Sequence, residues 1–308
     1  MKQSTRLFFT AAVVVILALL GVLPLWASGY ILGVLTVAYY FSVFAMAWDL
    51  LFGFANEVNF GPTFLIGLGA YGAGILNGHG FPIWSSVVLG TLIALVGGVV
   101  LALPALRVTG PYFGLTTLVA VLILQNLVVV FAGFTGGEIG LMVPDVLSLD
   151  ASVNYWFAFG FMVICGAILY ALSRSPMGLI LQASGQDAVQ AGALGFNITK
   201  HKLAAFIISA FFSGLSGALL VFYMGTASVS TLISITVGVQ IIIAAVIGGR
   251  RTIIGAAIGT IFLIAMTEAL RSTGELATFI VSAIALAVVL VAPNGFVGVV
   301  TGRRGERA

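Results

Sequence analysis

Long apolar runs separated by short polar stretches occupy almost the whole chain. A helix that crosses a bilayer needs roughly 20 mostly apolar residues, and runs of about that length recur from one end of the sequence to the other. The segment 60–76 is short and glycine-rich, so both a full crossing and a re-entrant helix fit it. Hydropathy and helix-breaking residues together predict ten candidate segments, at 7–27, 30–51, 60–76, 83–103, 112–132, 155–172, 203–224, 232–247, 253–270 and 276–291.

The first apolar run has an alternative interpretation as a cleaved signal peptide. Lys2 and Arg6 would form its basic start, and the bond between Ala27 and Ser28 would be its cleavage site. Its apolar stretch of about 18 residues is longer than the usual hydrophobic region of a signal peptide, and nine more segments follow. We therefore expect this run to be retained as the first membrane anchor.

The composition points to the same class of protein. Of the 308 residues 61% are apolar and only 7% are charged, whereas a soluble domain carries about 25% charged residues. The mean hydropathy is +1.23. These values exclude a soluble enzyme, a nucleic-acid-binding protein and a disulfide-stabilised secreted domain. The single cysteine, Cys165, lies inside an apolar run and provides neither a disulfide framework nor a metal-ligand pattern.

The distribution of basic residues predicts the topology, because cytoplasmic loops carry an excess of Lys and Arg. With the N-terminus inside and ten alternating crossings, Arg271 is the only basic residue that faces outward. The loop 133–154, which carries acidic residues and no basic residue, is also outside. We therefore expect cytoplasmic N- and C-termini and one all-α, polytopic transmembrane domain over 1–308. The basic residues assigned to the cytoplasm are Lys2, Arg6, Arg107, Arg174, Lys200, Lys202, Arg250, Arg251, Arg303, Arg304 and Arg307.

Glycine is abundant, with 39 residues in the chain, and it clusters within the predicted spans. Gly255 and Gly259 form a GxxxG pair. Small residues let helices approach closely in a bilayer, where there is no hydrophobic force between them. We interpret most of these glycines as tight helix packing, with mobile helices or a pore-lining face as the alternative.

The stretch 173–202 is too polar at its centre to cross a membrane, yet its small and apolar residues have helical spacing. Ser184 or Asp187 can cap a short helix there, and Gly195 followed by Asn197 can end it. Such a helix is either a surface on which a soluble partner pushes or an ordinary connector between two spans. The spacing alone does not choose between these two interpretations.

Several polar residues lie within or beside the predicted spans. They either bond neighbouring helices together or line a path for a polar solute. Glu268 lies three residues before Arg271, which predicts an ion pair on one helix face. Asp49 and Glu57 flank the end of a predicted hairpin, where we expect them to be solvated. The candidates for lining a path are Asn59, Thr116, Thr117, Gln125, Asn126, Gln240 and Glu268.

The sequence contains no energy-converting motif of its own. No glycine is followed by lysine, so the P-loop pattern GxxxxGK[ST], whose backbone cradles ATP phosphates, is missing. The acidic residues do not form the chain of a proton relay, and no span is rich in arginine. The chain is therefore expected to be non-catalytic, and if it pumps, a separate subunit supplies the energy. The alternative is a stand-alone channel for a small polar solute.

Six motifs, in order, resemble the permease subunits of bacterial branched-chain amino acid ABC transporters, of the LivM type. The resemblance runs from about residue 48 to residue 298. Asp49, Asn56 and Arg251 depart from the family pattern, which has Asn, Gly and Gly there. The motifs are DLLFGFANEVNFGPTFLIGLGAYGAGIL (49–76), LRVTGPYFGLTTL (106–118), TGGEIGL (135–141), GQDAVQAGALGFNITKHKLAAFIISAFFSGLSGAL (185–219), IGGRRTIIGAAIG (247–259) and PNGFVG (293–298).

This resemblance implies a type II-like importer bundle in the bacterial inner membrane. Its implied partners are a second, homologous permease, two cytoplasmic ATPase subunits that hold ATP and Mg, and a periplasmic solute-binding protein. The implied solute is a branched-chain amino acid or a related small polar molecule, because related permeases serve urea, short amides and organic acids. No cofactor and no metal is implied for this chain itself.

The resemblance also assigns roles to two polar stretches. The connector 173–202 would couple the bundle to the ATPases, and the outer loop 133–154 would meet the binding protein. The implied coupling residues are Gln182, Gly185, Asp187, Ala188, Ala191, Gly195 and Asn197, and the implied docking residues are Thr135, Gly136, Gly137 and Gly140.

Overall fold

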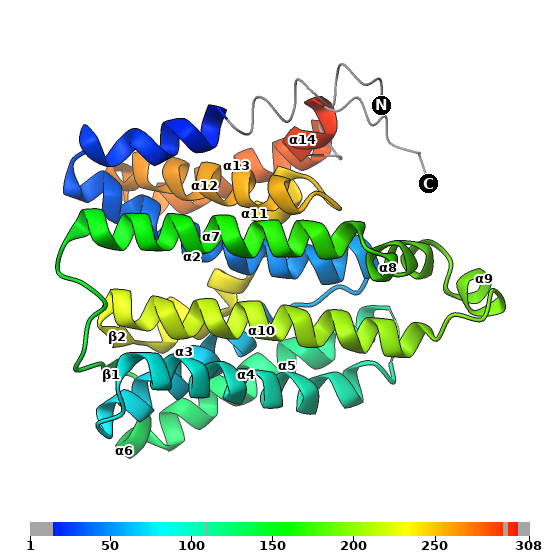
Figure 1. Ribbon diagram of the computed structural model, residues 1–308, viewed down its shortest axis with the longest axis horizontal. Coiled ribbons are helices and arrows are strands. Elements are labelled where there is room, and N and C mark those ends of the chain that lie inside the picture. The colour runs from blue at the N-terminus through cyan, green and yellow to red at the C-terminus, as the bar shows by residue number, and fades with distance from the viewer. Residues whose placement is uncertain (1–14, 109, 292–294, 301–308) are drawn as a thin grey trace.

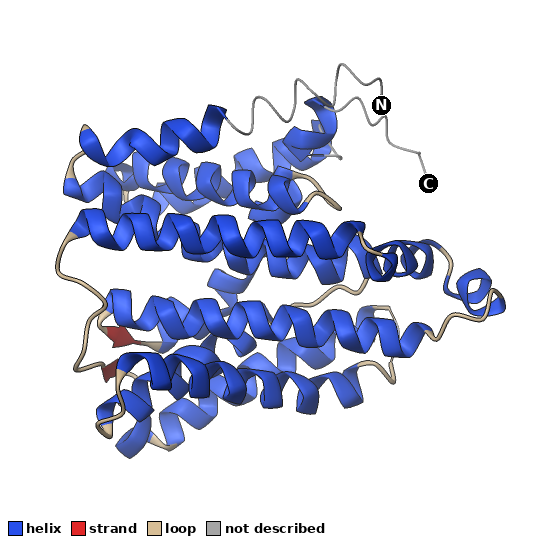
Figure 2. Cartoon of the chain, in the orientation of Figure 1, coloured by secondary structure: helices blue, strands red, loops and turns tan. Residues whose placement is uncertain are grey.

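A computed structural model describes residues 15–108, 110–291 and 295–300 as a bundle of helices whose axes run roughly side by side (Figure 1). The first half contains η1 (Leu23–Leu25), α2 (Gly29–Asp49), η2 (Leu50–Phe54), α3 (Pro62–Gly78), α4 (Ile83–Ala105), α5 (Pro111–Val130), α6 (Ala132–Thr135) and β1 (Leu141–Met142). The second half contains α7 (Ala151–Arg174), α8 (Pro176–Gln186), α9 (Ala188–Ala193), α10 (Ile198–Met224), β2 (Thr226–Ala227), η3 (Val229–Ile233), α11 (Ile235–Gly248), α12 (Ile253–Ala269), η4 (Arg271–Thr273), α13 (Glu275–Val291) and α14 (Gly295–Val300). Figure 2 shows how completely helix dominates.

Six helical stretches are long and apolar enough to cross a membrane, which confirms a multi-pass protein. They are Gly29–Phe54, Ile83–Ala105, Pro111–Val130, Ala151–Arg174, Ile198–Met224 and Val229–Gly248. Shorter apolar helices occupy Val15–Leu25, Ile253–Ala269 and Phe279–Val288. The predicted segment 60–76 corresponds to α3, whose 17 residues span about 26 Å. The count of ten crossings stays a prediction. Residues 7–14 of the first predicted segment, with Lys2 and Arg6, lie outside the described residues.

Glycine makes the close crossings of α3, α4 and α10. A β-carbon on Gly69 of α3 would overlap the carbonyl oxygen of Gly214 in α10, and one on Gly217 would overlap that of Ile66. A β-carbon on Gly90 of α4 would lie 2.7 Å from the carbonyl oxygen of Gly69. Contacts this close need residues without side chains, so these glycines serve packing, as the sequence indicated.

A second group of helices forms around α2, which contacts α7, α10 and α12. The hydroxyl groups of Tyr39 in α2 and Tyr155 in α7 are 2.7 Å apart and hydrogen-bonded. The predicted GxxxG pair lies where α12 meets α11, and a β-carbon on Gly255 would lie 2.6 Å from the carbonyl oxygen of Gly248. The GxxxG pattern therefore marks a helix–helix contact within the chain.

The two ends of the bundle differ. At one end β1 and β2 pair antiparallel, with Leu141 opposite Ala227, and this β1–β2 end lies at the left of Figures 1 and 2. At the other end α8 and α9 project beyond the long helices (Figure 1). The sequence predicted one short helix in the connector, and the structure has two because Asp187 is extended (φ −147°, ψ 103°) and caps α9.

The predicted segment 232–247 is a broken helix. The π-helical turn η3 ends at Ile233, and the extended backbone of Ser234 (φ −62°, ψ 146°) separates it from α11. The Ser234 side chain accepts a hydrogen bond of 3.2 Å from the backbone N–H of Val237. Serine competes for backbone donors in this way and is therefore common where helices begin.

Candidate functional site

The projecting segment α8–α9 is held by capping and carries exposed apolar side chains. Asp187 accepts a 2.9 Å hydrogen bond from the N–H of Gln190, and Asn197 accepts one of 3.0 Å from Lys200 as α10 begins. Ala191 is buried, whereas Val189 is 83% and Leu194 75% exposed. An apolar surface on a projecting helix is typical of a contact with another protein.

The remaining connector residues divide between buried and open positions. A β-carbon on Gly185 of α8 would lie 2.6 Å from the carbonyl oxygen of Phe54, so α8 rests directly on the end of η2. Gln182 is half-buried, and Ala188 is exposed. Gly195 has φ +88° with open space around it. This conformation favours glycine and lets the chain turn from α9 into α10.

Asp49, at the C-terminal end of α2, is buried, and the expectation that it is solvated was wrong. Its carboxylate accepts hydrogen bonds from the backbone N–H groups of Arg251 (3.1 Å) and Thr252 (3.0 Å). These two donors belong to the turn that precedes α12, so an acidic group stabilises the start of that helix. Asp49 thereby joins the end of α2 to the turn between α11 and α12.

Glu57 is also buried and paired, contrary to expectation. Its carboxylate forms an ion pair with the ammonium group of Lys202, the fifth residue of α10. The loop that contains Glu57 and Asn59 is also tied to α2, because the indole N–H of Trp48 donates a 2.6 Å bond to the carbonyl of Asn59. A buried acid is stable in such a place only when it is paired.

Two arginines between α11 and α12 bond to the segment that follows α2. Arg250 donates a 3.0 Å bond to the side-chain oxygen of Asn56 and lies over the ring of Phe52 at 4.3 Å. Arg251 donates a 2.9 Å bond to the carbonyl of Gly53. We call the set Asp49, Phe52, Gly53, Asn56, Glu57, Lys202, Arg250, Arg251 and Thr252 the α2 junction.

Sequence reasoning missed the α2 junction as a unit. Two signals were present: an aspartate inside an otherwise apolar run, and adjacent arginines between two predicted spans. Neither signal reveals the other, because about two hundred residues separate them along the chain.

The polar residues of α5 fall into two classes. Thr117 is buried and accepts a 3.0 Å bond from the N–H of Phe60, and Gln125 donates a 3.0 Å bond to the carbonyl of Ile233 at the end of η3. These two residues bond α5 to neighbouring segments. Asn126, by contrast, is exposed, and its amide N–H₂ donates a 2.8 Å bond to the carbonyl of Leu122 in its own helix.

The other candidate path residues are distributed differently. Thr116 is half-buried, and its hydroxyl donates to the carbonyl of Tyr112 at 2.9 Å. Gln240 of α11 is also half-buried. Asn59 is buried, and its side-chain oxygen accepts a 2.7 Å bond from the N–H of Gly61, which shapes the loop before α3. The structure therefore does not bring all the candidates together.

The loop 133–154 is anchored at both of its sides. The Thr135 hydroxyl donates to the carbonyl of Val128 at 2.5 Å. Gly136, Gly137 and Gly140 all have positive φ, which makes the tight turn before β1 possible. The amide of Asn77 in α3 donates a 2.8 Å bond to the carboxylate of Asp145. The loop is thus a fixed surface at the β1–β2 end.

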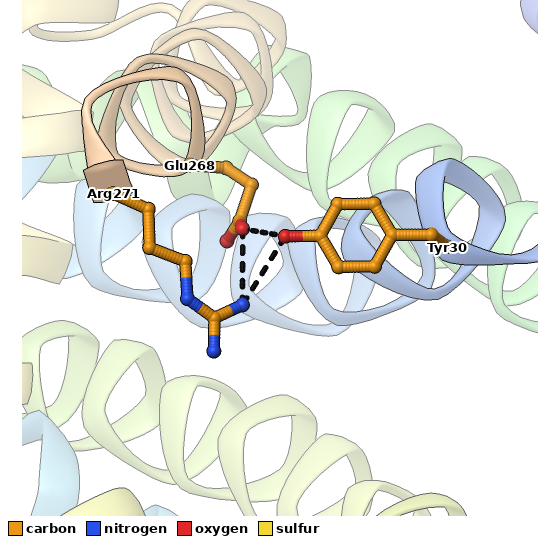
Figure 3. Close-up of polar contacts among 3 residues, drawn as sticks. All are labelled: Tyr30, Glu268 and Arg271. Atoms are coloured by element: carbon orange, nitrogen blue, oxygen red, sulfur yellow. Dashed lines mark hydrogen bonds and ion pairs between the residues drawn. The ribbon is translucent and has the colours of Figure 1, made fainter.

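Glu268 forms the predicted ion pair with Arg271, at 3.1 Å. The Tyr30 hydroxyl donates to the same carboxylate, and the Arg271 guanidinium donates to the Tyr30 oxygen at 3.1 Å (Figure 3). The cluster links the start of α2 to the end of α12. Because the Arg271 side chain is 71% exposed, this is an ordinary surface ion pair.

No metal site emerges from the described residues. Nowhere in them do three His, Cys, Asp or Glu side chains lie close enough together to hold an ion. Cys165 is a free, buried thiol within α7.

The matched family and solved fold agree with this architecture. Residues 30–293 match the family described as "Branched-chain amino acid transport system / permease component". The fold is similar to a structure described as an inward-facing conformation of a metal-chelate type ABC transporter, with a TM-score of 0.52 and 15% identity. That similarity covers 88% of this chain and 85% of the other.

Curated relatives extend the match along the sequence. The LivM permease proteins of the high-affinity branched-chain amino acid transport systems of Salmonella typhimurium and Escherichia coli are each 23% identical to it, over 94% of this chain and 74% of theirs. The LivH permease protein of Escherichia coli is 31% identical over 43% of each chain. The family match covers most of the chain, so this protein belongs to the permease component family of branched-chain amino acid ABC transport systems, and is of the LivM type.

Proposed function

We propose that this chain is one of two homologous permease subunits of an ATP-driven, binding-protein-dependent importer in the bacterial inner membrane. The observation that carries the proposal is the projecting α8–α9 segment of a membrane permease whose sequence has no P-loop. Two cytoplasmic ATPase subunits would hold ATP and Mg, and a periplasmic protein would deliver the solute. The chain itself would do no catalysis and hold no cofactor.

The coupling surface would be α9 with its flanking residues. Val189 and Leu194 present apolar side chains to a partner, and the ATPase subunit is the occupant we propose. Capping at Asp187 and Asn197 keeps α9 separate from the helices on either side, so a push on it moves a defined element. Differential contact of the ATPases with α9 in two states would shift the bundle between inward- and outward-facing forms.

The translocation path would run along α5 and α11, between this chain and its partner. Asn126 supports this proposal, because an exposed amide within a membrane-crossing helix is costly against lipid. Thr116 and Gln240 add polar groups on the same two helices. A path between two subunits would place these groups in water or against a second polar surface.

The loop at the β1–β2 end would receive the binding protein. Its turn at Thr135, Gly136, Gly137 and Gly140 is held by hydrogen bonds of the Thr135 hydroxyl, and a preorganised surface docks at a lower ordering cost. This assignment places the β1–β2 end in the periplasm, the α8–α9 end in the cytoplasm, and both termini on the cytoplasmic side, in keeping with the excess of basic residues there.

The solute we propose is a branched-chain amino acid or a related small polar molecule, supported by the names of the LivM relatives. The test is co-expression with a second permease and the ATPase and binding-protein genes, followed by purification and reconstitution in vesicles. We expect a stable complex and leucine uptake that requires both ATP and the binding protein. Solute flux through the single chain without ATP would refute the proposal and establish a channel instead.

A further inference from the structure

The α2 junction combines features that an ordinary helix end does not need. The chain continues from α2 into η2 (Leu50–Phe54), a π-helix, and this form is rare and often found at functional positions. Asn56 (φ 57°) and Arg251 (φ 60°) are the two non-glycine residues with positive φ in the described part of the chain, and both lie in the α2 junction. A positive φ costs about 1 kcal/mol or more in such residues, so the surrounding contacts must hold them there.

The α2 junction and the adjoining Phe54 contact three segments of the chain: α8, the N-terminal part of α10, and the turn between α11 and α12. Gly185 of α8 rests on the carbonyl of Phe54 with no room for a side chain. Lys202 of α10 is paired with Glu57. On the opposite side, Asp49 and Asn56 bond the turn at Arg250–Thr252 from which α12 starts.

We propose that Glu57 and Asn56 are positioning residues that transmit a displacement of the α8–α9 segment and the start of α10 to the turn between α11 and α12. This inference rests on the proposed function, since it needs an ATPase that moves α9. The step is mechanical: α8 pushes on Phe54, and Lys202 carries Glu57 with α10. Asn56, adjacent to Glu57, then pulls on Arg250.

The buried ion pair makes this connection stiff. The side chains of Glu57 and Lys202 are 10% and 16% exposed, so separating them would leave a charge in a poorly solvated place. The two segments therefore move together rather than slide past each other. α11 starts directly after the Ser234 break and carries Gln240 of the proposed path. Movement of the turn at the C-terminal end of α11 would therefore let the ATPases change that path.

The first test uses Glu57→Gln, Lys202→Gln and the reversed pair Glu57→Lys with Lys202→Glu in the complete reconstituted transporter. ATP hydrolysis and solute uptake are measured together. We expect each single variant to assemble and to hydrolyse ATP, with uptake per ATP lowered about 3- to 30-fold, and the reversed pair to recover most of the loss. Arg107→Gln, which removes an exposed base that follows α4, is the control and keeps the wild-type ratio.

The second test uses a variant that is expected to fold, so it remains informative even if the charge variants do not fold. Asn56→Gly relieves the positive φ, so the fold is kept or stabilised, but it removes the oxygen that accepts from Arg250. We expect unchanged or higher thermal stability together with lower uptake per ATP. Wild-type uptake per ATP in Asn56→Gly and in both single charge variants would overturn the inference. A wild-type preparation that contains no ATPase subunit would instead overturn the proposed function.

Discussion

Gly69 in α3 and Gly214 in α10 pack backbone against backbone, so closely that a β-carbon on either residue would overlap its neighbours. Gly90 of α4 also packs against Gly69, so three helices meet at this contact. This contact holds the half of the bundle that contains α3, α4 and α10. Disrupting this contact should therefore lower the stability of the protein.

Gly69→Ala should destabilise the protein by about 1–3 kcal/mol or more, because the added methyl group pushes α3 away from α10. Gly160→Ala is the matched control: this glycine is also inside a long helix, α7, and nothing lies within 4 Å of its β-carbon position. Thermal unfolding of the detergent-purified chain measures both. Equal melting temperatures for the two variants would contradict the packing argument.

Asp49→Ala should cost about 1–3 kcal/mol for each backbone donor that it leaves unpaired. The donors are the N–H groups of Arg251 and Thr252. Asp49→Asn keeps one acceptor oxygen and should lie between Ala and wild type. The exposed Glu138→Ala is the control, expected within about 0.5 kcal/mol of wild type. If Asp49→Ala unfolds at the wild-type temperature, the buried carboxylate does not stabilise the turn.

An Asn126→Cys variant tests whether α5 faces water. The background is Cys165→Ala, which removes the only native thiol. A charged thiol reagent reacts with a thiolate, which forms only where water reaches it. In the assembled complex Asn126→Cys should therefore be modified, and the control Ile168→Cys, at an exposed apolar position of α7, should stay unmodified. Protection at position 126 together with reaction at position 168 would exclude α5 from the path.

Glu268→Gln should change stability by less than about 1 kcal/mol, because exposed ion pairs contribute little. Tyr30→Phe should behave in the same way, since the Tyr30 ring is also well exposed. Melting curves at low and high salt measure both variants, and the wild-type protein should show no marked salt dependence from this cluster. A drop of many degrees in either variant would mean that the cluster locks α2 to α12.

Val189→Asp should prevent the ATPase subunit from co-purifying, because a charge would enter the proposed apolar contact. Ala191→Pro should do the same by removing the N–H that bonds to Asp187 at 3.1 Å. Leu149→Asp, at a residue that is also highly exposed but lies at the β1–β2 end, is the control and should retain the ATPase. Membrane insertion should be normal in all three. Solute-stimulated ATP hydrolysis at the wild-type level in Ala191→Pro would refute the coupling role.

Local sequence patterns were sufficient to predict much of this protein's structure. Apolar runs predicted membrane helices, since a helix satisfies its own backbone hydrogen bonds in lipid. The GxxxG pair predicted a close helix contact. Asp187 was one of two capping residues suggested by the sequence, and Glu268 with Arg271 was predicted by their spacing on one helix. Each of these features depends on residues a few positions apart, which is why the sequence alone could reveal them.

Tertiary structure decided the features that depend on distant partners. Hydropathy treats Asp49 and Glu57 as charges to be kept in water, but folding places the Arg251–Thr252 turn and Lys202 beside them and buries them paired. Folding likewise gives two adjacent residues different environments: Gln125 bonds to η3, whereas Asn126 is exposed. A buried polar group is stable only with a partner, and which residues of the chain supply that partner is fixed by helix packing rather than by sequence order.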